Sequence, residues 1–314
     1  MITAKNLTRK YGDIIAVDNA NFQIDHGEIV GLLGHNGAGK TTIMKMITGY
    51  IEPTAGEVIV DGLDILEDRS RIQEKIGYLP ENCPLYHDMS VVDYLIFAAS
   101  LKGIEGDKAR ESIRYSISKT KLESVASQRV ATLSRGYRQR LGVAQAILGS
   151  PKIYILDEPT NGLDPSQIQE MRALIKELAK KATVVVSTHI LQEVQATCNR
   201  VIIIRQGKVA LDSSMEELHT SNLLNVDVSK NGNGKSEIFD DFKDAKIVED
   251  KDEESKRSLI FEIEADKNNE EVAASLAKHI VDKGLKLYSM QPGIRDLETI
   301  FGEISEGVRE SGNE

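Results

Sequence analysis

The sequence is poor in cysteine and histidine and has no long apolar run. Its 314 residues include two cysteines, Cys83 and Cys198, which cannot form a disulfide framework and are typical of a protein in a reducing compartment. The six histidines are scattered without the His-x-x-x-His or Cys-x-x-Cys spacing of zinc sites, so nothing favours a metalloenzyme of that class. No apolar run approaches the roughly 20 residues that cross a bilayer, and residues 1–12 lack the apolar segment of a secretory signal. We therefore expect a cytoplasmic protein.

Basic residues are outnumbered by acidic ones. The formal net charge is −10, and −9 of it falls on residues 221–314. Because nucleic-acid-binding proteins present a basic face, we expect no nucleic-acid partner. The contents of hydrophobic residues (40%) and charged residues (28%) are ordinary for a globular protein, and the length indicates about two domains.

Three short runs rich in Ile, Val and Leu predict buried strands of a parallel sheet. They are EIVGLLG (28–34), IYILDEP (153–159) and TVVVSTH (183–189). Between the last two runs, apolar residues recur at helical spacing from Ile168 to Leu178, and Asp164 followed by Pro165 supplies a cap and a first turn. The order strand, helix, strand indicates an α/β core.

The remaining segments predict smaller substructures around this core. Residues 1–12 and 16–28 are expected to pair antiparallel, and 56–65 and 200–213 resemble hairpin strands. Residues from about 86 to 130 favour helices. After residue 220 the composition shifts: strands are expected at 224–229, 258–265 and 285–290, and helices at 269–284, with Gly284 as C-cap, and 294–304. Loops are expected at 229–236 and 249–257, with a frayed tail at 307–314.

A glycine-rich loop follows the first predicted strand. Residues Gly34–Thr41 read GHNGAGKT and fit the phosphate-binding pattern G-x-x-x-x-G-K-[ST] between a strand and a helix. Glycines allow consecutive N–H groups to face a phosphate, and the helix N-terminus adds favourable partial charge. Lys40 is expected to reach the β- and γ-phosphates, and the Thr41 hydroxyl to ligate Mg²⁺.

Acidic residues follow the second strand, and a histidine follows the third. Asp157 and Glu158 lie at the carboxyl end of a buried strand, where ligands bind in open α/β sheets. Asp157 would hold Mg²⁺, and Glu158 would polarise the attacking water. Because neighbouring parallel strands end at one sheet edge, His189 is expected to lie beside them, within reach of a γ-phosphate.

Five motifs in a fixed order carry a family resemblance. GHNGAGKT, LSRGYRQR, ILDEP, NGLD and STH resemble the nucleotide-binding domain of ABC transporters over about residues 1–220. The resemblance implies an α/β P-loop fold with a mixed sheet, an antiparallel β subdomain and a helical subdomain at about 86–150. A C-terminal α+β accessory domain would occupy 221–314. By this resemblance the motifs are Walker A (Gly34–Thr42), signature (Leu133–Gln139), Walker B (Ile153–Asp157), D-loop (Asn161–Asp164) and the H-loop histidine His189.

The resemblance also implies the site and its ligands, ATP and Mg²⁺. Tyr11 matches the aromatic residue that stacks on adenine. The residues implied to bind nucleotide are Tyr11, Gly34, His35, Asn36, Gly37, Ala38, Gly39, Lys40, Thr41, Thr42, Ser134 and Gly136. The implied metal ligands are Thr41, Glu81 and Asp157, and the implied catalytic residues are Lys40, Glu158 and His189.

Two motifs depart from the family pattern. In the signature, usually LSGGQ, Arg135 replaces the first glycine and Tyr137 replaces the glutamine, while Ser134 and Gly136 are retained. At the Q-loop, Glu81 stands where glutamine is usual, which adds negative charge near a triphosphate. The stretches YLPE and LSRGYRQR, with the acidic C-terminal module, look like a subgroup of ABC-2-type exporter subunits that includes drug-export and gliding-motility-associated ones.

For such a chain the family implies an ATPase whose two subunits sandwich two ATP molecules. Ser134 and Gly136 would serve the site of the partner subunit, and one intact motif set favours a homodimer. A separate membrane permease would dock on the helical insertion and hold the chain at the cytoplasmic face of the membrane. A soluble ATPase of translation or repair and an importer ATPase remain alternatives. For the C-terminal module, regulation, dimerisation, partner contact and an accessory role without a ligand all stay open.

Overall fold

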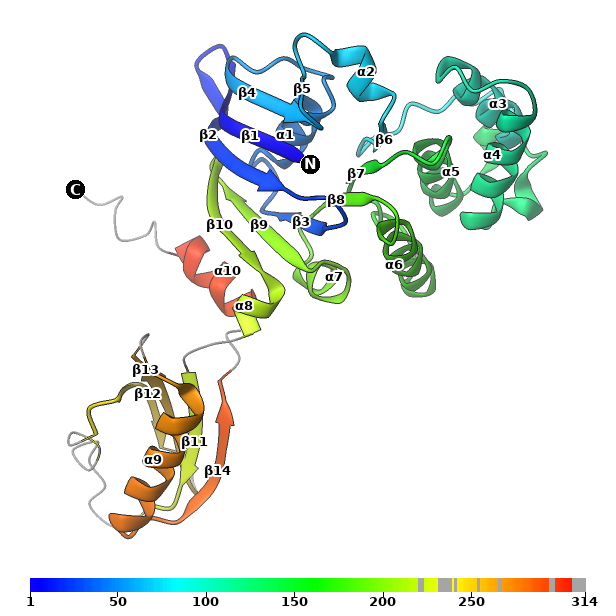
Figure 1. Cartoon of the computed structure of the whole chain (residues 1–314). Helices are drawn as coiled ribbons and strands as arrows, with labels where there is room; N and C mark the ends of the chain where they lie inside the picture. Colours follow the sequence, from blue (N-terminus) through cyan, green and yellow to red (C-terminus); the bar gives the residue numbers. More distant parts are fainter. Residues whose placement is uncertain are drawn as a thin grey trace. The chain divides into compact units, whose positions relative to one another are not determined.

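The computed structural model describes residues 1–219, 223–230, 239, 242–252, 255–264, 267–293 and 297–306. The chain divides into two compact units, Met1–Met215 and Glu216–Glu314 (Figure 1). Residue 220, at the boundary expected from composition, and the tail 307–314 lie outside the described residues. No helix in the described ranges is long and apolar enough to cross a membrane.

A six-stranded sheet forms the centre of the first unit. Its strands, in pairing order, are β10 (Lys208–Ser214), β9 (Arg200–Arg205), β3 (Ile29–Leu33), β8 (Thr183–Thr188), β7 (Ile153–Asp157) and β6 (Ile76–Leu79). The strands from β9 to β6 run parallel, and β10 pairs antiparallel with β9 around the turn at Gln206–Gly207. Every residue of β7 and β8 is buried. The prediction of buried parallel strands is therefore confirmed.

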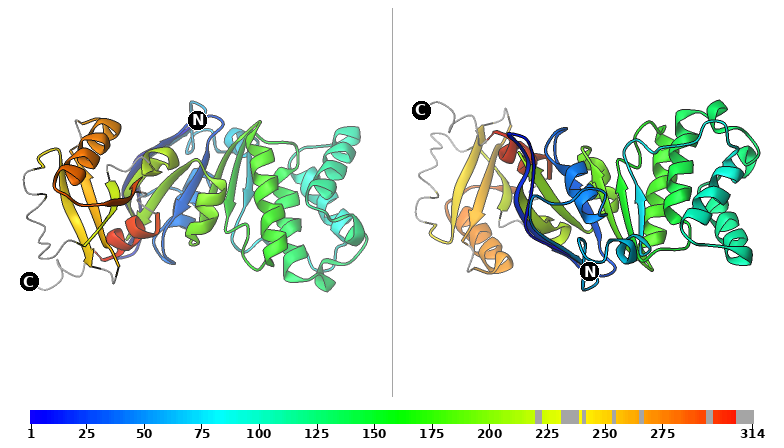
Figure 2. Two further views of the ribbon diagram at one scale, coloured as in Figure 1. Left: turned by 90° about the horizontal axis from the view of Figure 1, so that it is seen from below. Right: turned by 90° about the horizontal axis from the view of Figure 1, so that it is seen from above.

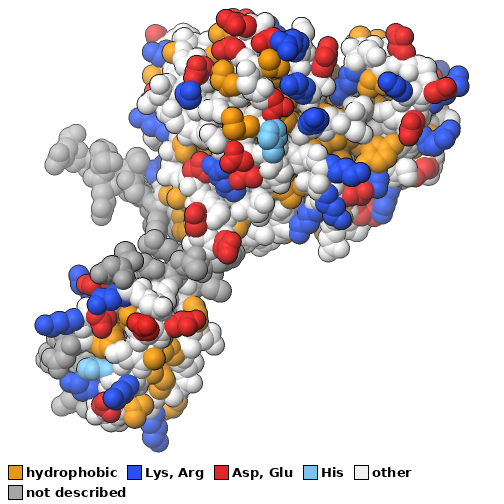
Figure 3. All heavy atoms as spheres, in the orientation of Figure 1, with side chains coloured by type: hydrophobic (Ala, Val, Ile, Leu, Met, Phe, Trp, Pro, Cys, Tyr) orange, Lys and Arg blue, Asp and Glu red, His pale blue; other side chains and the backbone are white. Residues whose placement is uncertain are grey.

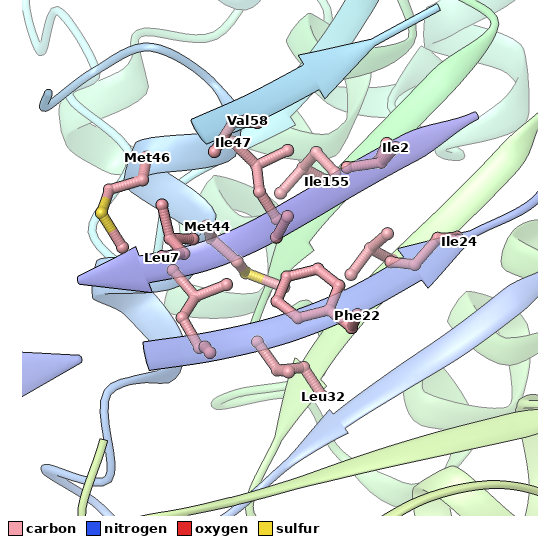
Figure 4. Close-up of a cluster of buried hydrophobic side chains, with 14 of the residues drawn as sticks. Ile2, Leu7, Phe22, Ile24, Leu32, Met44, Met46, Ile47, Val58 and Ile155 are labelled. Atoms are coloured by element: carbon pink, nitrogen blue, oxygen red, sulfur yellow. The ribbon is translucent and has the colours of Figure 1, made fainter. Parts of the chain in front are cut away.

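One face of this sheet packs against a helix and a second sheet. The second sheet is antiparallel, in the order β2 (Ile14–Ile24), β1 (Ile2–Tyr11), β4 (Ala55–Val60) and β5 (Leu63–Asp64). Helix α1 (Lys40–Ile47) contributes Met44 and Ile47 to a core shared by both sheets, with Ile2 from β1 and Ile155 from β7 (Figure 4). The predicted pairing of the N-terminal strands is confirmed. The large buried residues of α1 fix the loop that precedes it, because they cannot move without opening this core.

Two helices cover the opposite face of the six-stranded sheet. They are α5 (Arg135–Ile147) and α6 (Pro165–Ala179), and their apolar faces meet Leu156 and Val186 of the strands. Asp164 caps α6 by accepting a hydrogen bond from Gln167 N at 2.9 Å, with Pro165 in the first turn, as predicted. The short α7 (Leu191–Thr197) lies against β3, where its Val194 fills the space left by Gly31.

The remaining helices form a subdomain with its own core. It contains α3 (Val91–Leu101), α4 (Gly106–Lys119) and two short 3₁₀ turns, η1 (Glu123–Val125) and η2 (Val130–Thr132), packed on α5. The short α2 (Arg69–Gln73) precedes β6. Within the first unit, α3 and α4 lie at the end away from β1 and β2 (Figure 2). A mixed sheet with antiparallel and helical subdomains is the predicted fold class, which is confirmed.

The second unit is a small α+β domain. After α8 (Met215–His219), its sheet has the order β12 (Ala245–Asp252), β13 (Arg257–Ile263), β11 (Leu223–Val228) and β14 (Leu287–Pro292), all antiparallel. Helix α9 (Asn269–Asp282) buries its apolar face on this sheet, and Gly284 follows its C-cap with φ of +78°, as predicted. Helix α10 (Leu297–Glu306) begins after residues 294–296, which lie outside the described range.

One prediction in this unit is wrong. Residues 249–257 are not a loop throughout, because Glu249–Asp252 complete β12 and Arg257 opens β13. Charge does not prevent the strand here, since its side chains pair across the sheet: Arg257 Nε donates to Asp250 Oδ1 at 2.8 Å. β12 is also an edge strand, and charged residues are common at sheet edges. Of the loop predicted at 229–236, residues 231–236 lie outside the described range.

Candidate nucleotide-binding and catalytic site

The glycine-rich loop joins β3 to α1 in a conformation that only glycine tolerates. Gly37 and Gly39 have φ of +81° and +111°, in the region that side chains disfavour. A Cβ on Gly39 would lie 2.6 Å from the Ala16 carbonyl oxygen, and one on Gly34 would lie 2.4 Å from that of Ile204. The loop is therefore packed closely against β2 and β9.

Lys40 opens α1 and points back into this loop. The residue is 6% exposed, and its Nζ donates to the carbonyl oxygens of Gly34 at 2.6 Å and His35 at 3.1 Å. Burial lowers the pKa of Lys40, and the neighbouring carboxylates of Glu158, Asp157 and Glu81 oppose that shift. A buried ammonium thus lies near three acids from two other parts of the sequence.

Asp157 and Ser187 occupy paired positions at the ends of β7 and β8. Asp157 is fully buried, and its Oδ1 accepts a hydrogen bond from Ser187 Oγ. Its Oδ2 is buried and has no hydrogen-bond partner among the described residues. An unpaired buried carboxylate oxygen is costly, so this atom fits a cation or a cation-bound water as its partner.

Glu158 lies next to Asp157 in a strained backbone conformation. Its φ is +49°, a value that non-glycine residues rarely adopt and that often marks functional sites. Its N–H donates to the Oγ and the carbonyl oxygen of Ser187 at 3.1 and 3.2 Å, which holds the turn in place. Its carboxylate meets Nδ1 of His189 at 3.0 and 3.1 Å. Burial raises the pKa of Glu158, whereas His189 and Lys40 oppose the shift.

Two further predicted residues line a cavity beside the loop. Thr41 and Glu81 both line a cavity of about 570 Å³, and Glu81 is exposed. Glu81 and Thr41 therefore border the same cavity, and the charge of Glu81 acts on Lys40.

Tyr11 lies at the end of β1, on the hairpin whose second strand touches the phosphate loop. Gly39 meets Ala16 and Val17 of β2, and Val17 pairs with Arg9 of β1. The Tyr11 ring is 45% exposed and lies 4.6 Å from the Arg9 guanidinium carbon. Its stacking on adenine remains a prediction.

The signature segment forms the start of α5, far from the phosphate loop in sequence. Ser134 caps the helix by accepting from Tyr137 N at 3.3 Å. The nearest neighbours of an added Cβ on Gly136 would be Gln167 and Leu163, and Gln139 donates to the carbonyl oxygens of Glu158 and Pro159 at 3.1 Å each. The first turns of α5 therefore contact the segment that follows β7.

Comparisons with known proteins agree with this geometry. A sequence model of the family described as "ABC transporter" matches residues 17–161. The bacitracin transport ATP-binding protein BcrA of Bacillus licheniformis is 37% identical over 224 residues, covering 71% of this chain and 72% of BcrA. The uncharacterized ABC transporter ATP-binding protein YcbN of Bacillus subtilis (strain 168) is 31% identical over 310 residues, 98% of this chain and 97% of YcbN. The chain belongs to the ABC transporter family.

Solved ABC cassettes share the fold of the first unit. The cassette MJ0796 is 28% identical and covers 68% of this chain and 99% of its own. It was solved as a dimer, with a TM-score of 0.65, and as a post-hydrolysis dimer bound to ADP and Pi, with a TM-score of 0.64. The chain is thus the ATP-binding and ATP-hydrolysing subunit of an ABC transporter, a family whose cassettes dimerise and pair with membrane permeases.

The structure adds residues to this ABC site that the sequence motifs did not single out. Ser187 bridges Asp157 and the backbone of Glu158. Glu193 of α7 is 5% exposed, and its Oε2 accepts from Thr160 Oγ1 at 2.7 Å and Thr188 Oγ1 at 3.0 Å. Ser187 stands within the STH motif and could have been found by its neighbours, but Glu193 carries no motif signal of its own.

Proposed function

We propose that the chain is the ATPase subunit of an exporter and works as a homodimer on a separate permease at the cytoplasmic face of the membrane. The observation that carries the proposal is the convergence of Lys40, Asp157, Glu158 and His189 at the ends of three adjacent parallel strands. Support for the exporter class comes from BcrA, named for bacitracin transport, and from the YLPE and LSRGYRQR stretches that resemble exporter subunits.

The residues of the site divide the reaction among themselves. Lys40 and the N–H groups of residues 34–42 bind the β- and γ-phosphates, since an ammonium and a curled backbone are suited to phosphate charge. Glu158 accepts the proton of the attacking water, and its contact with His189 holds the carboxylate toward the γ-phosphate. Placing the carboxylate there requires the strained backbone conformation of Glu158, whose φ is +49°.

The residues around Asp157 fit a Mg²⁺ ion. The hydroxyl of Thr41 and the unpaired Oδ2 of Asp157 supply hard oxygen ligands, with Glu81 on the same side. When bound, Mg²⁺ neutralises charge on the phosphates of the nucleotide. By resemblance to the family signature, Ser134 and Gly136 serve the site of the second subunit, and in their own chain Ser134 caps α5 while Gly136 lies against Leu163 and Gln167.

A groove beside the ATP site offers a docking place for the permease. The cavity of about 570 Å³ lies between the phosphate-loop helix and the helical subdomain, and its lining is rich in aromatic side chains: Tyr50, Tyr78, Tyr86, Tyr94 and Phe97. Tyr50 and Tyr86 are 69% and 54% exposed. Aromatic residues are enriched at protein interfaces. The groove also contains Glu81 and Thr41, so a partner seated there would contact the ATP site directly.

Glu158→Gln tests the proposal. Loss of the general base is expected to lower kcat by about 10²- to 10⁴-fold, while ATP binding persists and an ATP-bound dimer accumulates in size-exclusion chromatography. Glu111→Gln on the exposed side of α4 is the control and should behave as wild type. In inside-out membrane vesicles that contain the permease, wild type but not Glu158→Gln should drive uptake of labelled bacitracin or a drug-like amphiphile. Wild-type turnover by Glu158→Gln contradicts the site, and ATP-driven flux out of such vesicles contradicts export.

A further inference from the structure

Arg135, the residue that departs from the family signature, contacts the D-loop of its own chain. Its Nη2 donates to Asn161 Oδ1 at 2.8 Å. The side chain also occupies the space over Gly162, where an added Cβ would lie 2.3 Å from Arg135 Nε. Gly162 has φ of +79°, so backbone conformation and available space both favour glycine there. The usual signature glycine has no side chain with which to make these contacts.

This contact joins two segments that serve different ATP molecules in the proposed dimer. Arg135 lies beside Ser134, which is assigned to the ATP held by the partner subunit. Asn161 lies three residues after Glu158, which is assigned to the ATP held by the same chain. Gln139, one turn further along α5, holds the carbonyl oxygens of Glu158 and Pro159. The start of α5 therefore contacts the loop after β7 through two side chains. Gln139 contacts its first residues, and Arg135 contacts the D-loop.

We propose that Arg135 is a positioning residue that clamps the D-loop to the signature turn, so that engagement of one ATP by Ser134 is passed to Glu158 at the other site. The proposal rests on the two-site homodimer put forward above. Arg135 acts through Asn161 and is not assigned a contact with nucleotide. Because the guanidinium is exposed and its partner is neutral, the hydrogen bond contributes little to stability. Its effect is expected in the rate of hydrolysis and in cooperativity between the two sites.

A double-mutant cycle on the full-length chain tests the clamp. Arg135→Ala and Asn161→Ala should each lower kcat about fivefold, equivalent to about 1 kcal/mol of barrier, with KM for ATP within twofold of wild type. The Hill coefficient should fall toward one in both variants. The double variant should be no slower than either single variant, because both changes remove the same interaction. Arg135→Lys keeps the charge without the planar fork and should restore part of the rate.

Controls separate this effect from folding and from the proposed function. Arg110→Ala removes an exposed arginine of α4 that pairs with Asp107, and should leave kcat and the Hill coefficient unchanged. Melting temperatures of all variants should stay close to wild type. If Arg135→Ala is unstable, Asn161→Ala alone still tests the clamp, since it leaves the arginine in place.

Two outcomes would overturn the inference. Additive effects of the two single variants would show that Arg135 and Asn161 act independently. A large rise in KM, or loss of the ATP-bound dimer in the Glu158→Gln background, for Arg135→Ala but not for Asn161→Ala would place Arg135 on the nucleotide. If Glu158→Gln with native Arg135 forms no dimer, the homodimer fails whatever the cycle gives.

Discussion

At the scale of single residues, the general-base role that we propose for Glu158 depends on its contact with His189. Burial raises the pKa of Glu158 above its ordinary value of 4.5, and Asp157 adds to that shift. The hydrogen bond and charge of His189 oppose it, as does the charge of Lys40. The carboxylate must be deprotonated to accept a proton from water, so activity should fall as the pH decreases through this pKa.

His189→Ala is therefore expected to change the pH profile as well as the rate. Removing the histidine takes away a contribution that lowers the pKa of Glu158, so the acid limb of kcat should move to higher pH. The measurement is kcat between about pH 5 and 8, the range in which folded proteins are usually most stable. His87→Ala, at an exposed position, should keep the native profile. An acid limb that stays in place or moves to lower pH would argue that His189 does not set the protonation of Glu158.

The sequence indicated the candidate site residues better than it indicated the side chains that contact them. Lys40, Asp157, Glu158 and His189 stand in motifs whose spacing has a chemical reason, and the structure brings them together. The partners of these residues depend on strand register, which no motif states. Asp157 meets Ser187 because β7 and β8 pair with those two positions opposite. The partner of Arg135 likewise lies 26 residues away and is set by how α5 meets the D-loop.

At the scale of elements, a buried carboxylate on α7 ties together the segments that follow β7 and β8. Glu193 accepts hydrogen bonds from Thr160, just after Glu158, and from Thr188, just before His189. Thr160 and Thr188 are 6% and 1% exposed, so water cannot readily replace the carboxylate. Helix α7 thus holds in place the two loops that carry Glu158 and His189, whose side chains contact each other.

Glu193→Ala and Glu193→Gln are expected to differ. Alanine leaves two buried hydroxyls without their acceptor and should lower the free energy of unfolding by about 2 kcal/mol, with a loss of kcat because Glu158 and His189 are less well held. Glutamine keeps an oxygen of similar shape in place and should stay close to wild type in both quantities. Urea denaturation and steady-state ATPase assays measure them. Equal behaviour of the two variants would show that the acceptor oxygen is not what holds the loops.

Helices and buried strands were predictable from apolar pattern, whereas a charged edge strand was not. β3, β7 and β8 are continuous apolar runs, which is typical of strands buried on both faces. β12 contains Glu249, Asp250, Lys251 and Asp252, a composition typical of loops. Its strand is stabilised by pairing with β13 and by ion pairs such as Arg257 with Asp250. Pairing of this kind between charged side chains leaves no apolar pattern in the sequence by which the strand could be recognised.

At the scale of the whole molecule, the two units differ in what they carry. Every predicted site residue lies within Met1–Met215, and so do the three hydrophobic clusters that support the site. The second unit has a separate core built from β11, β13 and α9. On the face shown in Figure 3, both units carry acidic and basic side chains interspersed. The match to YcbN extends over both units, whereas that to BcrA covers 71% of the chain.

This separation of cores predicts that the ATPase does not need the second unit. A fragment of residues 1–220 keeps all buried residues of the site and its support, so it should fold cooperatively and hydrolyse ATP with a KM within about twofold of the full chain. The fragment loses most of the negative charge, because −9 of the net −10 lies beyond residue 220. Circular dichroism, ATPase assays and size-exclusion chromatography with ATP would measure folding, turnover and dimerisation.

The same fragment carrying Glu158→Gln is the control and should be folded but inactive. A folded fragment that binds ATP but neither dimerises nor turns over would assign dimerisation to residues 221–314, whereas native turnover would leave that unit free for regulation or for contact with a partner.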